Sequence, residues 1–215
     1  MNWHRVWAKL AFAPLKEIRW CFPAATGKVY LTFDDGPFPG VTEQVLAILA
    51  REGVPATFFL SGIQLYRNRR RLADLDYAGH RVGNHCFHHR GMACQPGRRL
   101  VRQLQFTDRL IARHIGAPAR LCRPPYGIFA GGLLNAARHT GHRLVLWSLM
   151  AYDFALPPER TLERLCRLTR PGDIVVFHDS PLAAGTVIRV LPHYIAWCRQ
   201  QGLRFGVVEA AGSGN

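Results

Sequence analysis

The stretch Thr32-Phe33-Asp34-Asp35-Gly36-Pro37 places two adjacent carboxylates where an apolar strand meets a turn. Residues 28–33 alternate in the manner of a β-strand, and Gly36-Pro37 forces the chain to turn. Neighbouring residues of a strand point to opposite faces, so within a strand one of the two charges would be buried. At the end of the strand, the turn can direct both side chains into one cavity. The two aspartates therefore belong either to a functional site or to an ordinary surface turn. The rest of the chain favours a functional site.

The composition is typical of one globular domain with a strong positive charge. The 215 residues are enough for one substantial core, and 48% of them are hydrophobic. Lys and Arg number 28 against 14 for Asp and Glu, and this net charge of +14 attracts anions. We expect no nucleic-acid partner, because no nucleic-acid motif is recognisable and the aromatic residues are not interleaved with the basic ones. The densest basic run, Arg67 to Arg71, is typical of a solvated helix surface.

The first 27 residues differ in character from the rest and are predicted to form an amphipathic N-terminal extension. They mix tryptophans with basic residues, and their longest apolar run, 10–15, contains Pro14 and is too short for a signal-peptide core. The extension either packs on the domain or makes peripheral contact with an anionic membrane surface. Without a clear signal peptide, we expect a cytoplasmic or peripherally membrane-associated protein. Residues 210–215 are predicted to be a flexible tail.

Strand-like runs alternate with helix-like segments along the chain. This alternation predicts parallel strands with helices outside them, as a barrel or an open sheet. Six cysteines without Cys-x-x-Cys spacing give little indication of disulfides. The predicted strands are 28–33, 56–60, 81–84, 120–123, 143–148, 173–177 and 204–208, and the predicted helices are 41–51, 68–78, 98–115, 132–139, 157–169 and 191–201.

Polar residues follow five of these predicted strands. In a parallel barrel the carboxyl ends of the strands meet at one rim, where active sites are found. Five strand ends that bring polar groups to one rim therefore predict an enzyme. These groups are Asp34-Asp35, His85, Arg123-Pro124-Pro125-Tyr126, Asp153 and His178-Asp179.

Two histidines and a carboxylate are candidates for a metal site. His85 and His89 are four residues apart, which places both rings on one face of a helical turn. Two imidazoles and one carboxylate, with open positions left, form the ligand set of a catalytic zinc site. Asp35 is the natural third ligand, although His88 in place of His89 would also satisfy the spacing.

Four further residues can then support the attack of a metal-activated water and the departure of a leaving group. Asp34 can take the proton of the water as a general base, and His178 can protonate a leaving amine. Arg123 can keep the base charged and oriented. A backbone N–H near Tyr126 can stabilise an oxyanion.

The chain resembles the polysaccharide deacetylases, which are carbohydrate esterase family 4 and carry the NodB-type homology domain. Five motifs of that family occur in its order between residue 28 and about residue 208. They are Thr-Phe-Asp-Asp-Gly-Pro at 32–37, His85-Cys86-Phe87-His88-His89, Arg123-Pro124-Pro125-Tyr126, Asp153-Phe154, and the apolar strand 174–178 that ends in His178.

The resemblance implies a single catalytic domain at 28–209 with a distorted (β/α)7 barrel. It implies a divalent metal, most often Zn²⁺ with Co²⁺, Mn²⁺ or Ni²⁺ as alternatives, and removal of N-acetyl groups from chitin oligomers, peptidoglycan or related glycans. It also implies one role for each matching residue. Asp35, His85 and His89 would bind the metal, Asp34 would be the base, His178 the acid, Arg123 the support of the base, Tyr126 the oxyanion donor and Asp153 the partner of His178.

Three positions depart from the family pattern. Cys86 replaces a Ser or Thr, and we expect it to be buried behind the metal loop, with a role as an extra thiolate ligand as the alternative. Phe154 replaces a Trp, and Met150 stands where many members have an acid. These changes leave two other functions open. One is deformylation or deacylation of a lipid-linked amino sugar, and the other is glycan binding by a relative that has lost catalysis.

Overall fold

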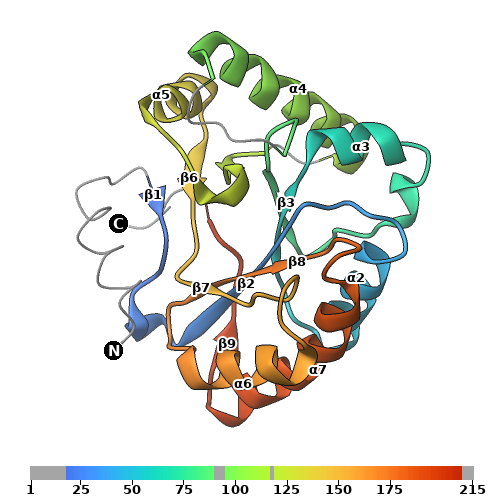
Figure 1. The fold of residues 1–215 in the computed structure, drawn as a ribbon, viewed down its shortest axis with the longest axis vertical. Helices are drawn as coiled ribbons and strands as arrows, with labels where there is room; N and C mark the ends of the chain where they lie inside the picture. Colours follow the sequence, from blue (N-terminus) through green and yellow to red (C-terminus); the bar gives the residue numbers. More distant parts are fainter. Residues whose placement is uncertain (1–17, 90–94, 117–118, 210–215) are drawn as a thin grey trace.

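The computed structural model describes residues 18–89, 95–116 and 119–209, and Figure 1 shows their arrangement. The strands are β1 (Ile18–Arg19), β2 (Lys28–Asp34), β3 (Thr57–Leu60), β4 (Arg81–Asn84), β5 (Leu121–Cys122), β6 (Arg143–Val145), β7 (Leu149–Met150), β8 (Ile174–His178) and β9 (Arg204–Phe205). The helices are α2 (Thr42–Arg51), α3 (Gly62–Asn68), α4 (Gly97–Ile115), α5 (Gly131–Thr140), α6 (Pro158–Leu168) and α7 (Ala184–Gln200), with 3-10 turns η1 (Ala24–Thr26), η2 (Leu72–Asp74) and η3 (Pro125–Gly127).

The strands form a curled parallel sheet with the helices on its outside (Figure 1). Their order is β1-β6-β5-β4-β3-β2-β8-β7, and β9 pairs with the start of β2. Residues 146–148 cross from β6 to β7, where the Leu146 N–H donates to the Arg19 carbonyl and the Ser148 N–H to the Ile174 carbonyl. This crossing joins the two ends of the strand order. The fold is the predicted distorted (β/α)7 barrel, a single domain with parallel strands.

The core lies between the sheet and the helices that cover β2, β3 and β8. The rings of Phe33, Phe58 and Phe177, one from each of these strands, stack with centroids 4.9 and 5.7 Å apart. All three side chains are fully buried. Strands buried on both faces consist of nearly continuous apolar residues, as in 174–177. The three central strands therefore form a rigid frame whose carboxyl ends carry the polar groups.

Several predicted elements have different bounds in the structure, among them the strand predicted at 204–208, of which only Arg204–Phe205 is formed, and three further elements. The helix predicted at 68–78 was wrong: α3 lies earlier, because the Gln64 and Leu65 N–H groups bond the Ser61 carbonyl as soon as β3 ends. Leu72 and Leu75 are buried in a 3-10 turn, for which a spacing of three residues is as suitable as for an α-helix. The strand predicted at 143–148 divides into β6 and β7, and α7 begins at Ala184 because its buried face continues across Pro192.

Part of the predicted N-terminal extension belongs to the barrel. Ile18 and Arg19 form β1 and pair with Leu144 and Val145 of β6. Residues 20–27 of the extension are also described and contain η1, whereas residues 1–17 and the predicted tail, 210–215, lie outside the described residues. Among the helices of the described ranges, none is both long enough and apolar enough to cross a bilayer.

Candidate active site

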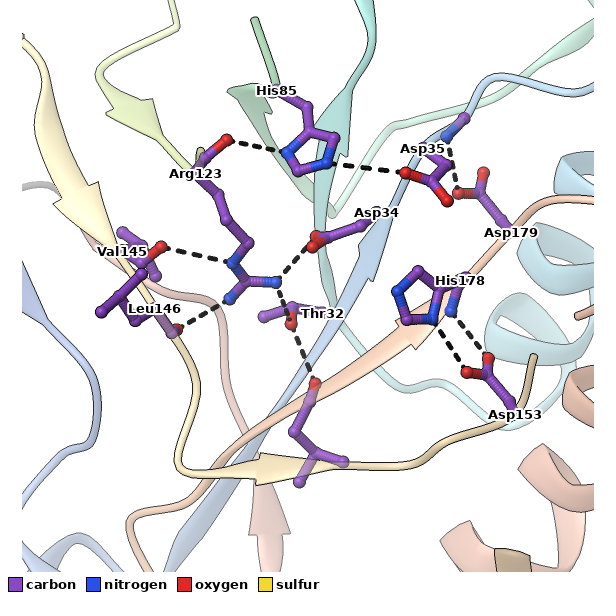
Figure 2. Close-up of polar contacts among 12 residues, drawn as sticks. Thr32, Asp34, Asp35, His85, Arg123, Val145, Leu146, Asp153, His178 and Asp179 are labelled. Atoms are coloured by element: carbon purple, nitrogen blue, oxygen red, sulfur yellow. Dashed lines mark hydrogen bonds and ion pairs between the residues drawn. The ribbon is translucent and has the colours of Figure 1, made fainter. Parts of the chain in front are cut away.

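The carboxyl ends of the central strands bring the predicted site residues together at one rim (Figure 2). Asp34 is the last residue of β2, and it is the register partner of His178, the last residue of β8. His85 directly follows β4, and Arg123 directly follows β5. The structure thus gathers residues that are up to 144 positions apart in the chain, because parallel strands end at the same edge of the sheet.

Arg123 is fully buried and holds Asp34. Its Nη1 donates to Asp34 Oδ1 at 2.8 Å and to Thr32 Oγ1 at 2.7 Å. Its Nε and Nη2 donate to the carbonyls of Val145 and Leu146 at 3.3 and 2.9 Å. Burial lowers the pKa of Arg123, and the Asp34 carboxylate opposes that shift. The guanidinium therefore fixes the position of the Asp34 carboxylate.

Asp35 faces two imidazoles rather than hydrogen-bond donors of good geometry. Its Oδ1 is buried and accepts no hydrogen bond, while His89 Nε2 lies 3.1 Å and His85 Nε2 3.6 Å from it. Burial raises the pKa of Asp35, but the two histidines outweigh it and hold that pKa well below its usual range. Burial lowers the pKa of His89, and Asp35 reverses this, so the net shift is upward. The negative charge of Asp35 thus lies between two imidazoles, and no hydrogen-bond donor of good geometry among the described residues neutralises it.

The tautomer of His85 strengthens this conclusion. His85 Nδ1 lies 2.7 Å from the carbonyl oxygen of Arg123, which can only accept, so Nδ1 carries the proton. In the neutral ring, Nε2 then presents a lone pair toward the Asp35 carboxylate. A cation between them resolves this repulsion, and metal-binding histidines commonly donate their other N–H to a backbone carbonyl. One ligand atom from each of Asp35, His85 and His89 lies within 4.8 Å of the other two. The residues present fit a divalent metal ion.

The two candidate ligand histidines do not lie on a helical turn as the spacing predicted. Residues 85–89 form an irregular loop in which Cys86 has φ of 61°. The loop directs His89 toward Asp35, whereas the backbone N–H of His88 bonds Gln103 Oε1 and its ring packs on Phe87. The structure therefore selects His89 over His88. It does so through tertiary contacts, because the spacing alone allowed either.

His178 is held by Asp153 through both of its carboxylate oxygens (Figure 2). The His178 backbone N–H donates to Oδ2 at 2.7 Å, and the ring Nδ1 donates to Oδ1 at 2.8 Å. Burial lowers the pKa of His178, but the bond to Asp153 and the nearby carboxylates raise it to about 9. The ring is therefore protonated at neutral pH, with Nε2 as its second donor. Phe154 packs edge-on against it at 5.0 Å between ring centroids.

Tyr126 lies beside the loop 85–89 and has a strained backbone conformation. Its φ is 60°, and its ring contacts the His89 ring at 4.5 Å between centroids. Positive φ is uncommon for residues other than glycine and gathers at functional sites. In the described part of the chain it occurs at four such residues, all in segments that carry site residues. They are Asp35, Cys86, Tyr126 and Tyr152.

Cys86 does not belong to the group of potential ligands. It is fully buried in an apolar cluster that also contains Cys122, and a hydrogen bond to Cys86 together with burial raises the pKa of the Cys122 thiol. The Cys86 backbone N–H donates to Asn84 Oδ1 at 2.8 Å. This placement agrees with the expectation that Cys86 is buried behind the candidate metal ligands. Cys86, Cys122, Cys166 and Cys198 are free thiols, and Cys94 lies outside the described residues.

Sequence reasoning gave no role to Asp179, although it recognised the His178-Asp179 pair. Asp179 is fully buried, and its carboxylate accepts from the Gly36 N–H at 3.1 Å and from Thr42 Oγ1 at 2.6 Å. Burial raises its pKa to about 7, against the opposing effect of these two bonds. The acid at the end of an apolar strand was a visible signal, but its partners are more than 130 residues away.

Comparisons with known proteins agree with the site. The model of the polysaccharide deacetylase family matches residues 23–145, more than half of the chain. A chitooligosaccharide deacetylase of Rhizobium leguminosarum bv. phaseoli is 37% identical over 71% of this chain and 68% of its own. A peptidoglycan-N-acetylglucosamine deacetylase of Bacillus cereus is 29% identical over 91% of this chain and 92% of its own.

One solved structure of similar fold is that of a pseudoenzyme. A pseudoenzyme of carbohydrate esterase family 4 from Bacillus anthracis superposes with a TM-score of 0.82 at 26% identity, covering 89% of this chain and 67% of its own. A mutant of that protein is described as having restored enzymatic activity. The family match, the barrel and the shared motifs together show that this chain belongs to the polysaccharide deacetylase family, and its curated relatives are deacetylases, which are hydrolases of carbon–nitrogen bonds other than peptide bonds.

Proposed function

We propose that this protein removes N-acetyl groups from amino-sugar glycans in a metal-dependent hydrolysis. The observation that carries the proposal is the group Asp35, His85 and His89, whose ligand atoms lie within 4.8 Å of one another at the rim that also holds Asp34 and His178. Two imidazoles and one carboxylate favour Zn²⁺. When bound, such an ion supplies positive charge for the amide carbonyl oxygen and lowers the pKa of a water toward about 7.

Asp34 is proposed as the general base. Its carboxylate is buried at the end of β2 and is held by Arg123 at 2.8 Å, so it is oriented at the rim. A base held in this way accepts the proton of the attacking water without first reorganising. Arg123 acts on the reaction through Asp34, because its guanidinium is engaged by Thr32, Asp34 and two carbonyls.

His178 is proposed as the general acid. Asp153 occupies Nδ1 and raises the pKa of the ring to about 9, which leaves a proton on Nε2 for the departing amine. Tyr126 is proposed to contribute its backbone N–H to the developing oxyanion, because its positive φ turns the main chain beside His89. The base and the acid come from neighbouring strands, which suits attack and departure on opposite sides of one carbonyl.

The substrate class rests on the named activities of the relatives. Chitooligosaccharide and peptidoglycan deacetylases are among them, and both act on N-acetylated amino sugars. We therefore propose a glycan of that class as the substrate. Removal of a formyl or another acyl group from a lipid-linked amino sugar would use the same residues, and Phe154 beside His178 is where the wall of the site departs from the family motif.

The test measures acetate and formate release from chitooligosaccharides, peptidoglycan and lipid-linked amino sugars, using protein stripped with a chelator and then reloaded with Zn²⁺. We expect about one Zn²⁺ per chain, acetate release only in the reloaded protein, and loss of release in Asp34→Asn and His178→Ala without loss of zinc. Asp35→Asn should lose the zinc itself. Zinc-loaded protein that releases neither acid from any of these glycans would overturn the proposal and favour a glycan-binding pseudoenzyme.

A further inference from the structure

Arginines gather on the outer surface of α3 and α4, which pack side by side on the outside of the barrel (Figure 1). We propose that this surface, the α3–α4 face, docks on the anionic headgroups of a phospholipid bilayer. The proposal is independent of the deacetylation described above. The α3–α4 face is defined by the exposed residues Tyr66, Arg67, Arg69 and Arg70 on and after α3, and by Arg98, Arg99, Arg102, Phe106, Arg109 and Arg113 on α4.

The exposed charges of α4 are all positive. The helix contains one acidic residue, Asp108, whose carboxylate is engaged by Asn84 Nδ2 at 2.7 Å and by His142 Nε2 at 3.1 Å. Its five exposed arginines form no ion pair with any part of the chain that the structure describes. Within the described part of the chain, no ion pair therefore neutralises the α4 arginines of the α3–α4 face.

Most arginines on the opposite helices are different: three of the five on α6 and α7 form ion pairs, whereas Arg164 and Arg167 form none within the described part of the chain. Arg160 pairs with Glu163 within α6, and Arg189 of α7 pairs with Glu159 at 3.1 Å. Arg199 of α7 pairs with Glu52 at 2.9 Å. A high arginine content alone would leave both sides of the barrel equally unpaired. The concentration of unpaired cations on one side is therefore a property of the α3–α4 face.

Helix stability does not account for this placement. Arg98 and Arg99 lie in the first turn of α4, which carries no acidic residue, although the positive end of the helix dipole disfavours cations there. Burial and the nearby Arg113 and Arg69 lower the pKa of His114, as expected where the charges of α3 and α4 add. An external anion would relieve both kinds of repulsion.

Two exposed aromatic residues favour a lipid surface over a dissolved polyanion. Tyr66 is 48% and Phe106 37% exposed, and each ring lies under an arginine three residues further along the chain. The Arg69 guanidinium is 4.9 Å from the Tyr66 centroid, and that of Arg109 is 5.6 Å from the Phe106 centroid. Aromatic rings prefer the headgroup level of a bilayer, and arginine stems can cover apolar atoms while their charged ends reach phosphates. Basic residues near an anionic leaflet each add to the attraction.

The first experiment uses the full chain and sedimentation with phosphatidylcholine vesicles, prepared with and without phosphatidylglycerol. The test variant is Arg102→Glu/Arg109→Glu/Arg113→Glu. The control variant, Arg160→Glu/Arg167→Glu/Arg189→Glu on α6 and α7, changes the net charge equally. We expect binding only to the anionic vesicles, a loss of at least about tenfold in the test variant, and near wild-type binding in the control. Thermal unfolding confirms that both variants are folded.

A second pair of measurements separates lipid from other polyanions. Tyr66→Ser/Phe106→Ser should weaken binding to anionic vesicles while leaving binding to heparin or duplex DNA unchanged. The proposal is overturned if wild-type protein ignores anionic vesicles, or if both charge variants lose binding equally, because diffuse net charge would then explain it. It is also overturned if the aromatic substitutions leave vesicle binding unchanged, because the occupant would then be a soluble polyanion.

Discussion

The carboxylate of Asp179 lies directly against Gly36, whose N–H donates to it at 3.1 Å. The Asp179 backbone N–H donates in turn to the carbonyl of Asp34 at 3.2 Å, so one residue after β8 holds both sides of Asp35. A side chain at position 36 would overlap the carboxylate. Asp35 itself has φ of 80°, a strained conformation that persists only where its surroundings impose it. Asp179 and Gly36 together impose it here.

Replacing Gly36 with alanine should therefore disturb the fold and the metal site together. The added Cβ collides with the Asp179 carboxylate, and overpacking of this kind costs about 1–3 kcal/mol. We expect a lower free energy of unfolding in urea and weaker zinc binding. Gly185→Ala is the matched control, because a Cβ there meets no other atom within 4 Å. Wild-type zinc affinity in Gly36→Ala would contradict the steric relationship.

Replacing Asp179 with asparagine should weaken zinc binding without a clash. The amide oxygen can still accept from the Gly36 N–H, but the carboxylate charge is lost. The amide NH2 group then stands where Asp179 Oδ2 accepts from Thr42 Oγ1. Loss of such a supporting contact commonly lowers metal affinity about 10- to 100-fold. A competition titration with a zinc chelator measures this. Thr42→Ser, which keeps the hydroxyl, should retain the wild-type affinity, and equal affinity in Asp179→Asn would remove Asp179 from this role.

The same substitution should change how stability depends on pH. The folded-state pKa of Asp179 is about 7, above the usual 3.8, so the folded protein holds the proton more tightly. This contribution is fully present below about 3.8 and is lost as pH rises through about 7. In metal-free protein, wild type should therefore lose more stability than Asp179→Asn between about pH 5 and 8. Parallel urea-unfolding curves for the two proteins across that range would be the contrary result.

Replacing Arg123 with lysine should be costly although it keeps the charge. A lysine ammonium cannot reach Thr32, Asp34 and both carbonyls at once, so buried polar atoms lose their partners. Breaking a buried ion pair costs about 3–5 kcal/mol. We expect a large loss of unfolding free energy and a lower kcat with little change in KM. Arg160→Lys at an exposed pair should leave both unchanged. Wild-type kcat in a folded Arg123→Lys variant would remove Arg123 from the support of the base.

Replacing Asp153 with asparagine should shift the alkaline limb of activity. His178 must be protonated to act as an acid, and its pKa of about 9 depends on Asp153. Removing that carboxylate should move the limb of kcat/KM for acetate release to lower pH by about 1–3 units. Stability should respond in the same direction. The gain from His178 is present below about 6.5 and disappears as pH rises through about 9, so the variant should be destabilised at neutral pH and not above about 9. An unshifted limb would exclude His178 as the acid.

The strands and the polar groups at their ends were predictable from the sequence because both depend on neighbouring residues. Alternation over 28–33 followed by Gly36-Pro37 specifies a strand and its turn locally, and the apolar run 174–177 ends in His178 for the same reason. Parallel strands must end at one edge, so the meeting of Asp34 with His178 followed from the fold class.

Only the tertiary structure decided how these groups are held. The choice of His89 over His88 depends on an irregular loop that packs on α4 through Gln103, and the spacing of the histidines could not specify it. The hydrogen bond from the Gly36 N–H to the Asp179 carboxylate joins residues 143 positions apart. Such contacts depend on the register of distant strands, which no local pattern encodes, whereas the order of strands and turns is encoded in each short stretch by itself.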